Sequence, residues 1–244
     1  MSPGEQAGPC LADTFALYRD EIDAFHDRRE RLIKTSRDVT ALSKKLIFHL
    51  HRSSNAATPD ELAPLLAAAH TKLREISQMI IKCGIEEGLA ASFGSPNDTM
   101  NRFERFLGGA LEEWIEAVSF LHFLEHDALI SYEEVQSLLV SDELQCVRVT
   151  PWRYLLGLCD LTGELMRYAI NGIAGSDPLA KMERVLQMQH TIYSALEPLA
   201  ALSGDICKKQ HITLSSIRKV EEGMRTNSQS SCLYYACTLR RVCP

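Results

Sequence analysis

Hydrophobic residues recur along most of the chain at spacings of three and four, the period of an amphipathic α-helix. Glycine and proline divide this pattern into segments, and no segment alternates convincingly as a β-strand does. The pattern predicts seven helices, at 12–52, 59–91, 98–126, 132–140, 151–173, 178–202 and 212–225. Residues 1–10 and about 226–244 are predicted to be loose. Short connections between long helices predict one all-α domain over residues 1–244, a seven-helix antiparallel bundle.

Four of the predicted helices begin with recognisable capping residues. The stretch "TPDE" places Thr58 at the N-cap, Pro59 at the first helical position and Glu61 two residues later. The stretch "SYEE" at 131–134 repeats this arrangement. "TP" at 150–151 and "SDP" at 176–178 predict two further helix starts.

The composition, 45% hydrophobic and 24% charged residues, is typical of an ordinary globular protein. No apolar run reaches the length of a membrane span and no secretory signal opens the chain, so we expect no membrane attachment. The eight cysteines include no Cys-x-x-Cys pair, which argues against a zinc site or disulfide framework and favours a reducing compartment. A net charge of −6 does not suggest nucleic acid, although a global sum can hide a local basic patch.

Two glutamates stand in a segment that otherwise reads as a buried helix. In "LEEWIEAVSF", residues 111–120, Glu113 and Glu116 share the helix with Trp114 on one side and with Phe120 and Phe123 beyond. A helix that is apolar nearly all round belongs to a core, where an unpaired carboxylate is costly. The glutamates therefore require a basic partner, a raised pKa or a metal ion.

A second acidic pair, Asp160 and Glu164, is spaced i, i+4 in "YLLGLCDLTGELMRYAI", residues 154–170, where Arg167 can pair with Glu164. If the two helices pack face to face, four carboxylates meet, although spacing alone does not establish that contact. Such an oxygen-only cluster selects Mg²⁺, Mn²⁺ or Ca²⁺, and carboxylate-held metals activate water in nucleases. A di-iron site would need Glu-x-x-His, which neither pair has.

The first predicted helix carries a concentrated basic charge. Residues 28–52 hold eight lysines or arginines and two acids, a local charge of +6. Five of these basic residues fall within an arc of roughly 100° on the helical wheel, and we call them the basic stripe: Lys34, Arg37, Lys44, Lys45 and Arg52. The stripe is either a phosphate-binding surface or a solvated face. We identify no aromatic residue within it, so it predicts charge without base stacking.

Three stretches carry a resemblance to a known family: "HDRRERLIKTSRDVT", "WIEAVSFLHFL" and "RVTPWRYLLGLCDLTGELMR". In these stretches the chain resembles the translin superfamily, and within it the translin-associated factor X branch. The resemblance runs from about Phe15 to Glu221, and its "DLTGELMR" and "EAVSF" blocks are specific to the family. It implies an all-α bundle of seven helices, in agreement with the helix pattern.

The resemblance also implies an activity. This branch supplies a Mg²⁺-dependent endoribonuclease, with Mn²⁺ able to replace Mg²⁺, and its acids match Glu113, Glu116, Asp160 and Glu164. These four would serve as metal ligands and catalytic residues. The alternative function is a non-catalytic subunit that binds nucleic acid and a partner, with its acids paired to Arg167 or Arg148.

Partners and location follow from the same resemblance. It implies assembly with a translin-like subunit into a hetero-octamer that binds single-stranded RNA and DNA, in the cytoplasm and nucleus. We expect Arg37, Lys44, Lys45 and Arg148 to contact nucleic acid. Because the 98–126 helix is apolar on two sides, we also expect one of those sides to meet a second subunit or a cavity wall.

Overall fold

The computed structural model of the protein describes residues 10–56, 58–89, 99–142, 144–174 and 177–239, and the side chains of α7 as far as Asn227. Seven α-helices occur in this part of the chain: α1 (Leu11–His51), α2 (Pro59–Glu86), α3 (Thr99–His126), α4 (Tyr132–Ser137), α5 (Pro151–Asn171), α6 (Pro178–Ala200) and α7 (Gly204–Leu239). Two short 3₁₀ helices, Arg52–Asn55 and Gly172–Ala174, follow α1 and α5. The predicted all-α bundle of seven helices is confirmed.

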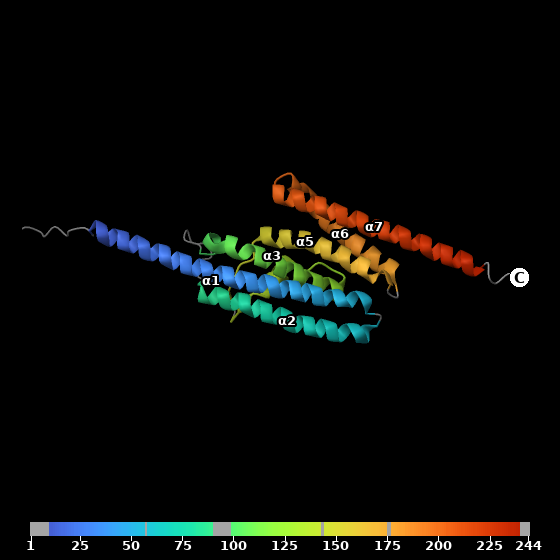
Figure 1. Ribbon diagram of the computed structural model, residues 1–244, viewed down its shortest axis with the longest axis horizontal. Coiled ribbons are helices and arrows are strands. Elements are labelled where there is room, and N and C mark those ends of the chain that lie inside the picture. The colour runs from blue at the N-terminus through green and yellow to red at the C-terminus, as the bar shows by residue number, and fades with distance from the viewer. Residues whose placement is uncertain (1–9, 57, 90–98, 143, 175–176, 240–244) are drawn as a thin grey trace, which may run out of the picture.

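The helices form a bundle with α3 and α5 at its centre (Figure 1). Helix α3 packs against α1 and α5, while α5 packs in turn against α6 and α7. Helix α2 lies along α1 on the outer side. The N-terminal part of α1 and the C-terminal part of α7 extend beyond the bundle at opposite ends (Figure 1).

The capping residues identified in the sequence begin their helices as predicted. The side chains of Thr58, Thr150 and Asp177 each accept a hydrogen bond from a backbone N–H in the first turn. Ser131 and Glu134 form the complete reciprocal capping box of α4. These side chains replace backbone partners that the first turn of a helix lacks, so local sequence fixes the starts.

Several predicted boundaries are wrong. Helix α2 ends at Glu86 rather than near residue 91, and α4 ends at Ser137 instead of residue 140. A small antiparallel hairpin follows α4, although we predicted no strand: β1 (Val140–Ser141) pairs with β2 (Leu144–Gln145), with Val140 opposite Gln145. Two residues per strand are too few to show an alternating pattern.

The last helix differs most from its prediction of 212–225. Helix α7 begins at Gly204, and its backbone stays helical through residues 226–239, which we predicted to be loose. The missed first turns bury a polar side chain, because Gln210 donates a hydrogen bond to the Tyr193 carbonyl. A buried polar residue interrupts the regular spacing of hydrophobic residues, and that spacing is the sequence signal of an amphipathic helix. The other predicted loose end lies outside the described residues, apart from Cys10.

The core is centred on α3, where Trp114, Ile115 and Phe120 are fully buried. The Phe120 ring lies 5.0 Å from that of His51 on α1 and 5.9 Å from that of Tyr168 on α5. Both apolar sides of α3 are therefore covered within this chain, by α1 and α5. The apolar character of α3 therefore gives no reason to expect a second subunit or a cavity wall on either of these sides, because the bundle already has a helix on each.

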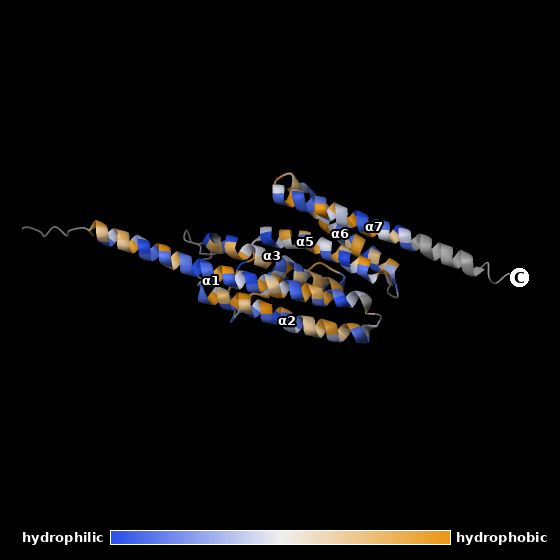
Figure 2. Ribbon diagram, in the orientation of Figure 1, coloured by the Kyte–Doolittle hydropathy of each residue, from blue (hydrophilic) through white to orange (hydrophobic). Residues whose placement is uncertain are grey.

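Exposed apolar residues occur where α1 extends beyond the bundle (Figure 2). Leu11, Phe15 and Tyr18 there are 74%, 65% and 57% exposed. Within the described residues, no helix combines the length and the apolar character needed to cross a membrane.

Candidate functional site

All four predicted acids line one pocket between α1, α3 and α5. The pocket has a volume of about 680 Å³. Its walls are formed by Lys44, Ile47, Phe48 and His51 of α1, Glu113 and Glu116 of α3, and Asp160, Glu164, Arg167 and Asn171 of α5. The sequence could only place each pair on its own helix, whereas packing of α3 against α5 brings the two pairs together.

Helical register and one glycine explain why the pairs meet. On α5, Leu161 and Leu165 are fully buried in the core, so the carboxylates on the neighbouring face turn toward the pocket. Gly157 lies where α5 crosses α3. A Cβ atom there would stand 2.7 Å from Ile115 Cγ2 and 3.1 Å from the Glu112 carbonyl oxygen. The missing side chain therefore allows the close approach of the two acidic helices.

A half-buried arginine also links these helices. Arg153, in the first turn of α5, donates hydrogen bonds to the carboxylates of Glu104 and Glu112 on α3. Its guanidinium lies over Gly108, where a Cβ atom would overlap it. Sequence spacing does not reveal this link, because Arg153 lies 41 positions from Glu112 and 49 from Glu104.

Glu116 is the most buried of the four acids, with 7% of its surface exposed. Burial, and after it the nearby charges of Asp160, Glu164 and Glu113, together raise the pKa of its carboxyl to about 9, although the charge of Lys209 acts in the opposite direction. The sequence left three explanations open for this glutamate. The structure shows a raised pKa, produced by desolvation and by like charges.

In metal-free buffer, Glu116→Gln is expected to flatten the pH dependence of folding stability. The native carboxyl has a pKa of about 9, against about 4.3 in an unfolded chain, so between these values only the native state keeps the proton. The free energy of unfolding of the wild type should therefore fall as pH rises from about 4.5 to 9, by at most about 1.4 kcal/mol per pH unit. Urea denaturation with EDTA, at pH values near 5, 7 and 9, measures this slope. Identical slopes for the two proteins would contradict the prediction.

Lysines neutralise two of the other carboxylates. Lys44 Nζ lies 3.1 Å from Glu113 Oε1, joining α1 to α3. Lys209 Nζ, from α7, lies 2.6 and 2.5 Å from the two carboxylate oxygens of Asp160. Lys209 is only 21% exposed, so this pair is less screened by solvent than an ordinary surface salt bridge.

Glu164 is held by two residues. Arg167 Nη1 donates to its Oε2 across 2.9 Å, which confirms the predicted i, i+3 pair. His51 Nε2 lies 2.5 Å from the same oxygen, and the histidine is 9% exposed. Its other ring nitrogen, Nδ1, is buried without a hydrogen-bond partner among the described residues. Glu164 is therefore the residue that orients the His51 ring in this pocket.

The donor set fits a hard divalent cation, because four carboxylates supply oxygen ligands around one cavity. Glu116 supports the fit, since a divalent cation would offset the crowding of negative charge that raises its pKa. Within the described residues, however, no three His, Cys, Asp or Glu side chains stand in the arrangement of a formed metal site. The other three carboxylates hold basic side chains instead, so cation binding requires them to exchange those partners.

Comparison with known proteins shows the family to which the chain belongs. The sequence pattern of the translin family matches residues 27–224, a range that includes all four carboxylates. The chain belongs to the translin family. It is 34% identical over 228 residues to Translin-associated protein X of Mus musculus, across 85% of this chain and 74% of that protein. It is 26% identical over 220 residues to the Translin-associated protein X homolog of Schizosaccharomyces pombe, and this match covers 86% of this chain and 85% of that protein.

Solved structures with the translin-family fold superpose on most of the chain. The crystal structure of apo-NeC3PO is 19% identical, with a TM-score of 0.68, and the match covers 90% of this chain and 100% of that one. The AfC3PO–duplex RNA complex is also 19% identical, with a TM-score of 0.65 over 89% and 97% of the two chains. At this level of identity the likeness shows the fold.

Two residues that line the pocket, His51 and Phe48, and one that pairs with a pocket carboxylate, Lys209, were not predicted as site residues from the sequence. Lys209 lies just before the predicted start of the last helix and carries no recognisable motif. His51 lies near the end of the first predicted helix and was not singled out from the sequence. Phe48 gave a detectable signal, because it falls one turn after Lys44, within the arc of the basic stripe. The expectation that no aromatic residue accompanies the stripe is therefore wrong.

The predicted nucleic-acid contacts lie in two places. Arg37, Lys44 and Lys45 are exposed on α1, and Lys44 also lines the pocket. Arg148 is half-buried between β2 and α5, where its charge acts on the Tyr132 hydroxyl. It is not among the residues that line the carboxylate pocket. The structure therefore groups the three α1 residues and separates them from Arg148.

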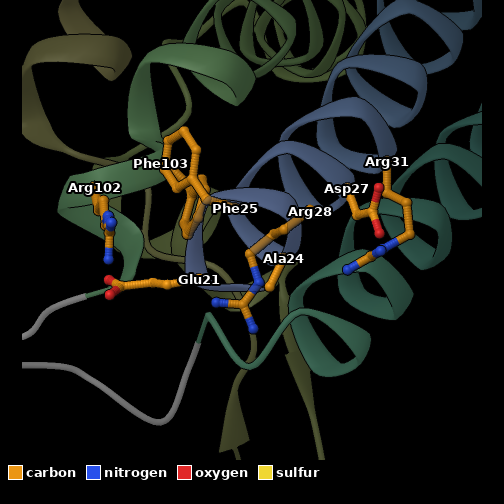
Figure 3. A pocket seen from close by; sticks show the side chains of 8 residues that line it. All are labelled: Glu21, Ala24, Phe25, Asp27, Arg28, Arg31, Arg102 and Phe103. Atoms are coloured by element: carbon orange, nitrogen blue, oxygen red, sulfur yellow. The ribbon is translucent and has the colours of Figure 1, made fainter. Parts of the chain in front are cut away.

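A second pocket, of about 420 Å³, lies farther along α1 beside the start of α3 (Figure 3). Phe25 and Phe103 stack there with ring centroids 5.3 Å apart. Arg31 binds the buried Glu87 through two hydrogen bonds of 2.6 and 3.0 Å, and Arg28 Nε lies 3.3 Å from the same carboxylate. Because two of its arginines hold Glu87, we assign this pocket a structural role in joining α1 to the end of α2.

Proposed function

We propose that this chain is the Mg²⁺-dependent endoribonuclease subunit of a complex with a translin-type partner, and that it cleaves single-stranded RNA. The observation that carries the proposal is the pocket in which Glu116, nearly buried, lies among three further carboxylates. A like-charged cluster of this kind is a poor structural element, because it opposes ionisation of its own members. Perturbed carboxyls in a cavity are typical of functional sites.

The comparisons support the proposal at a coarser level. Two relatives carry the name Translin-associated protein X, which describes a protein associated with translin. A solved structure with the same fold, AfC3PO, is described as a complex with duplex RNA. A nucleic-acid-binding subunit of a hetero-oligomer agrees with both, and we further propose that the assembly is an octamer that also accepts single-stranded DNA.

In the proposed reaction Glu113, Glu116 and Asp160 would hold the cation, and Glu164 would complete the set or act as the base. Bound Mg²⁺ would supply charge stabilisation at the phosphate and a more acidic water. Before it binds, Lys44 and Lys209 supply part of that positive charge. His51 and Arg167 fix the carboxylate of Glu164, which positions it at the wall of the pocket.

One observation favours the alternative, a subunit that binds nucleic acid and a partner without catalysis. Three of the four carboxylates already pair with basic side chains, as a purely structural cluster would. The deciding experiment is cleavage of single-stranded RNA by the purified complex in Mg²⁺, compared with the same complex in EDTA. Metal-independent cleavage, or no cleavage at any Mg²⁺ concentration, would rule out the proposed activity.

Neutralising the basic stripe is expected to weaken RNA binding without regard to sequence. The suitable variant combines Lys34→Gln, Arg37→Gln and Lys45→Gln, because these residues are exposed, whereas Lys44 also pairs with Glu113. Each lost phosphate contact should reduce the slope of log K against log salt by about 0.7, hence about 2 for three contacts. Titrations of single-stranded RNA in EDTA at several salt concentrations measure both affinity and slope.

A triple variant on α2, Lys72→Gln, Arg74→Gln and Lys82→Gln, removes the same charge from another helix and serves as the control. It should leave the salt slope close to that of the wild type. If both triple variants reduce the slope equally, the basic stripe is a solvated face that acts only through net charge.

A further inference from the structure

Phe48 is a large aromatic side chain in an unusual position. It is 76% exposed, whereas Phe103, Phe120 and Phe123 are at most 2% exposed. It nevertheless lines the carboxylate pocket, at the edge formed by α1. An exposed phenylalanine contributes little to folding, because its apolar surface remains in water. Its position at the mouth of a polar pocket therefore points to a ligand.

The surroundings of Phe48 indicate what kind of ligand. Residues four apart on a helix share a face, so Lys44 lies one turn before the ring and Arg52, the C-cap of α1, lies one turn after it. Lys45, three positions earlier, is exposed beside them. An aromatic ring between cations, open to solvent, matches the pattern of single-strand binding surfaces, in which bases stack on rings and phosphates meet basic residues.

The basic residues around Phe48 adjoin the carboxylate pocket. Lys44 contacts both features, since it belongs to the basic stripe and its Nζ lies 3.1 Å from Glu113 in the pocket. A base stacked on Phe48 would therefore hold its strand at the wall of the pocket that Lys44, Glu113 and Glu116 also line. A phosphate of that strand could then pair with Lys44, beside the carboxylates.

We propose that Phe48 is a positioning residue that stacks an unpaired nucleobase and thereby places the strand in the carboxylate pocket. This inference rests on the proposed function. It adds that the Phe48 ring is the group by which the protein distinguishes single-stranded RNA from duplex RNA. Bases in a duplex are already stacked on each other and present no free face to the ring. The Phe48 ring should therefore contribute to binding of single-stranded RNA and contribute nothing to binding of duplex RNA.

The test uses the full chain, co-purified with a translin-type partner and kept in EDTA so that RNA remains intact. Phe48→Ala, Phe48→Leu and Phe48→Trp are compared for binding of a single-stranded oligonucleotide containing 2-aminopurine. The alanine and leucine variants should bind about fivefold to a hundredfold more weakly, whereas tryptophan should restore binding. Wild-type protein should quench the 2-aminopurine fluorescence, and the alanine variant should not. Affinity for a duplex of the same sequence should be unchanged in all variants.

Phe15→Ala is the matched control, because Phe15 is also exposed on α1 but does not line the pocket. It should leave single-strand affinity unchanged. The inference fails, while the proposed function stands, if the wild type binds and cleaves RNA but the Phe48 variants bind normally. It also fails if they lose duplex affinity equally, or if light scattering shows that they lose the partner. A wild-type complex that binds no RNA would overturn both.

Discussion

Substitution of Glu116, Glu113 or Asp160 by alanine is expected to abolish Mg²⁺-dependent RNA cleavage while leaving RNA binding intact. Each of these carboxylates lines the same pocket, and each is a proposed ligand of the cation. Loss of a ligand removes charge stabilisation of several kcal/mol from the transition state, which corresponds to at least about a hundredfold loss of rate. Initial cleavage rates at saturating Mg²⁺ and RNA affinity in EDTA measure the two effects separately.

Glu125→Ala is a suitable control for these variants. Glu125 lies on α3 as well, but it pairs with His70 of α2, at 2.6 Å, and does not line the pocket. Its loss should leave the cleavage rate within about twofold of the wild type, as for a surface pair worth less than about 1 kcal/mol. Retention of more than about a tenth of the wild-type rate by all three pocket variants would refute the ligand assignment.

Gly157→Ala is expected to destabilise the protein and to impair its site together. The added Cβ would lie 2.7 Å from Ile115 Cγ2 and 2.9 Å from Ile115 Cβ, close to the α3 backbone, so the neighbour cannot simply rotate away. Helices α3 and α5 must separate, which costs about 1–3 kcal/mol for overpacking of this kind. Because each helix carries one acidic pair, Mn²⁺ binding should weaken in the same variant. Urea denaturation and Mn²⁺ titration by electron paramagnetic resonance measure the two quantities.

Gly163→Ala provides a control on the same helix. A Cβ atom at Gly163 would meet nothing within 4 Å. Alanine is the better helix former, so this change should stabilise the protein by about 0.5–1 kcal/mol and leave cation binding unaltered. If the two glycine variants show the same stability and the same Mn²⁺ affinity, close approach at Gly157 does not shape the site.

Capping chemistry and periodicity account for most of what could be predicted about the fold. Thr58, Ser131, Thr150 and Asp177 fix four helix starts through bonds within a few residues of themselves. The end of α2 and the early start of α7 involve contacts with more distant parts of the chain, Arg31 with Glu87 and Gln210 with Tyr193. In α7, for example, Gln210 is buried because the Tyr193 carbonyl accepts its hydrogen bond. Such partners leave no local pattern.

For the candidate site, too, some features follow from local sequence and others only from tertiary packing. The sequence alone determined that Glu113 and Glu116 share one helix and that Asp160 and Glu164 share one face of another, because helical spacing fixes both. Only the tertiary structure decided that the two pairs meet, since that contact depends on the close approach of α3 and α5 at Gly157.

The charges around the acids were likewise decided by packing. Lys209 reaches Asp160 from a helix 49 residues away in sequence, and His51 reaches Glu164 across 113 residues. The raised pKa of Glu116 follows from burial and from carboxylates on two helices, and neither is a property of its own segment. Periodicity relates residues within a helix, whereas desolvation and Coulomb interactions act through space, so the sequence supplied the acids and the fold set their ionisation.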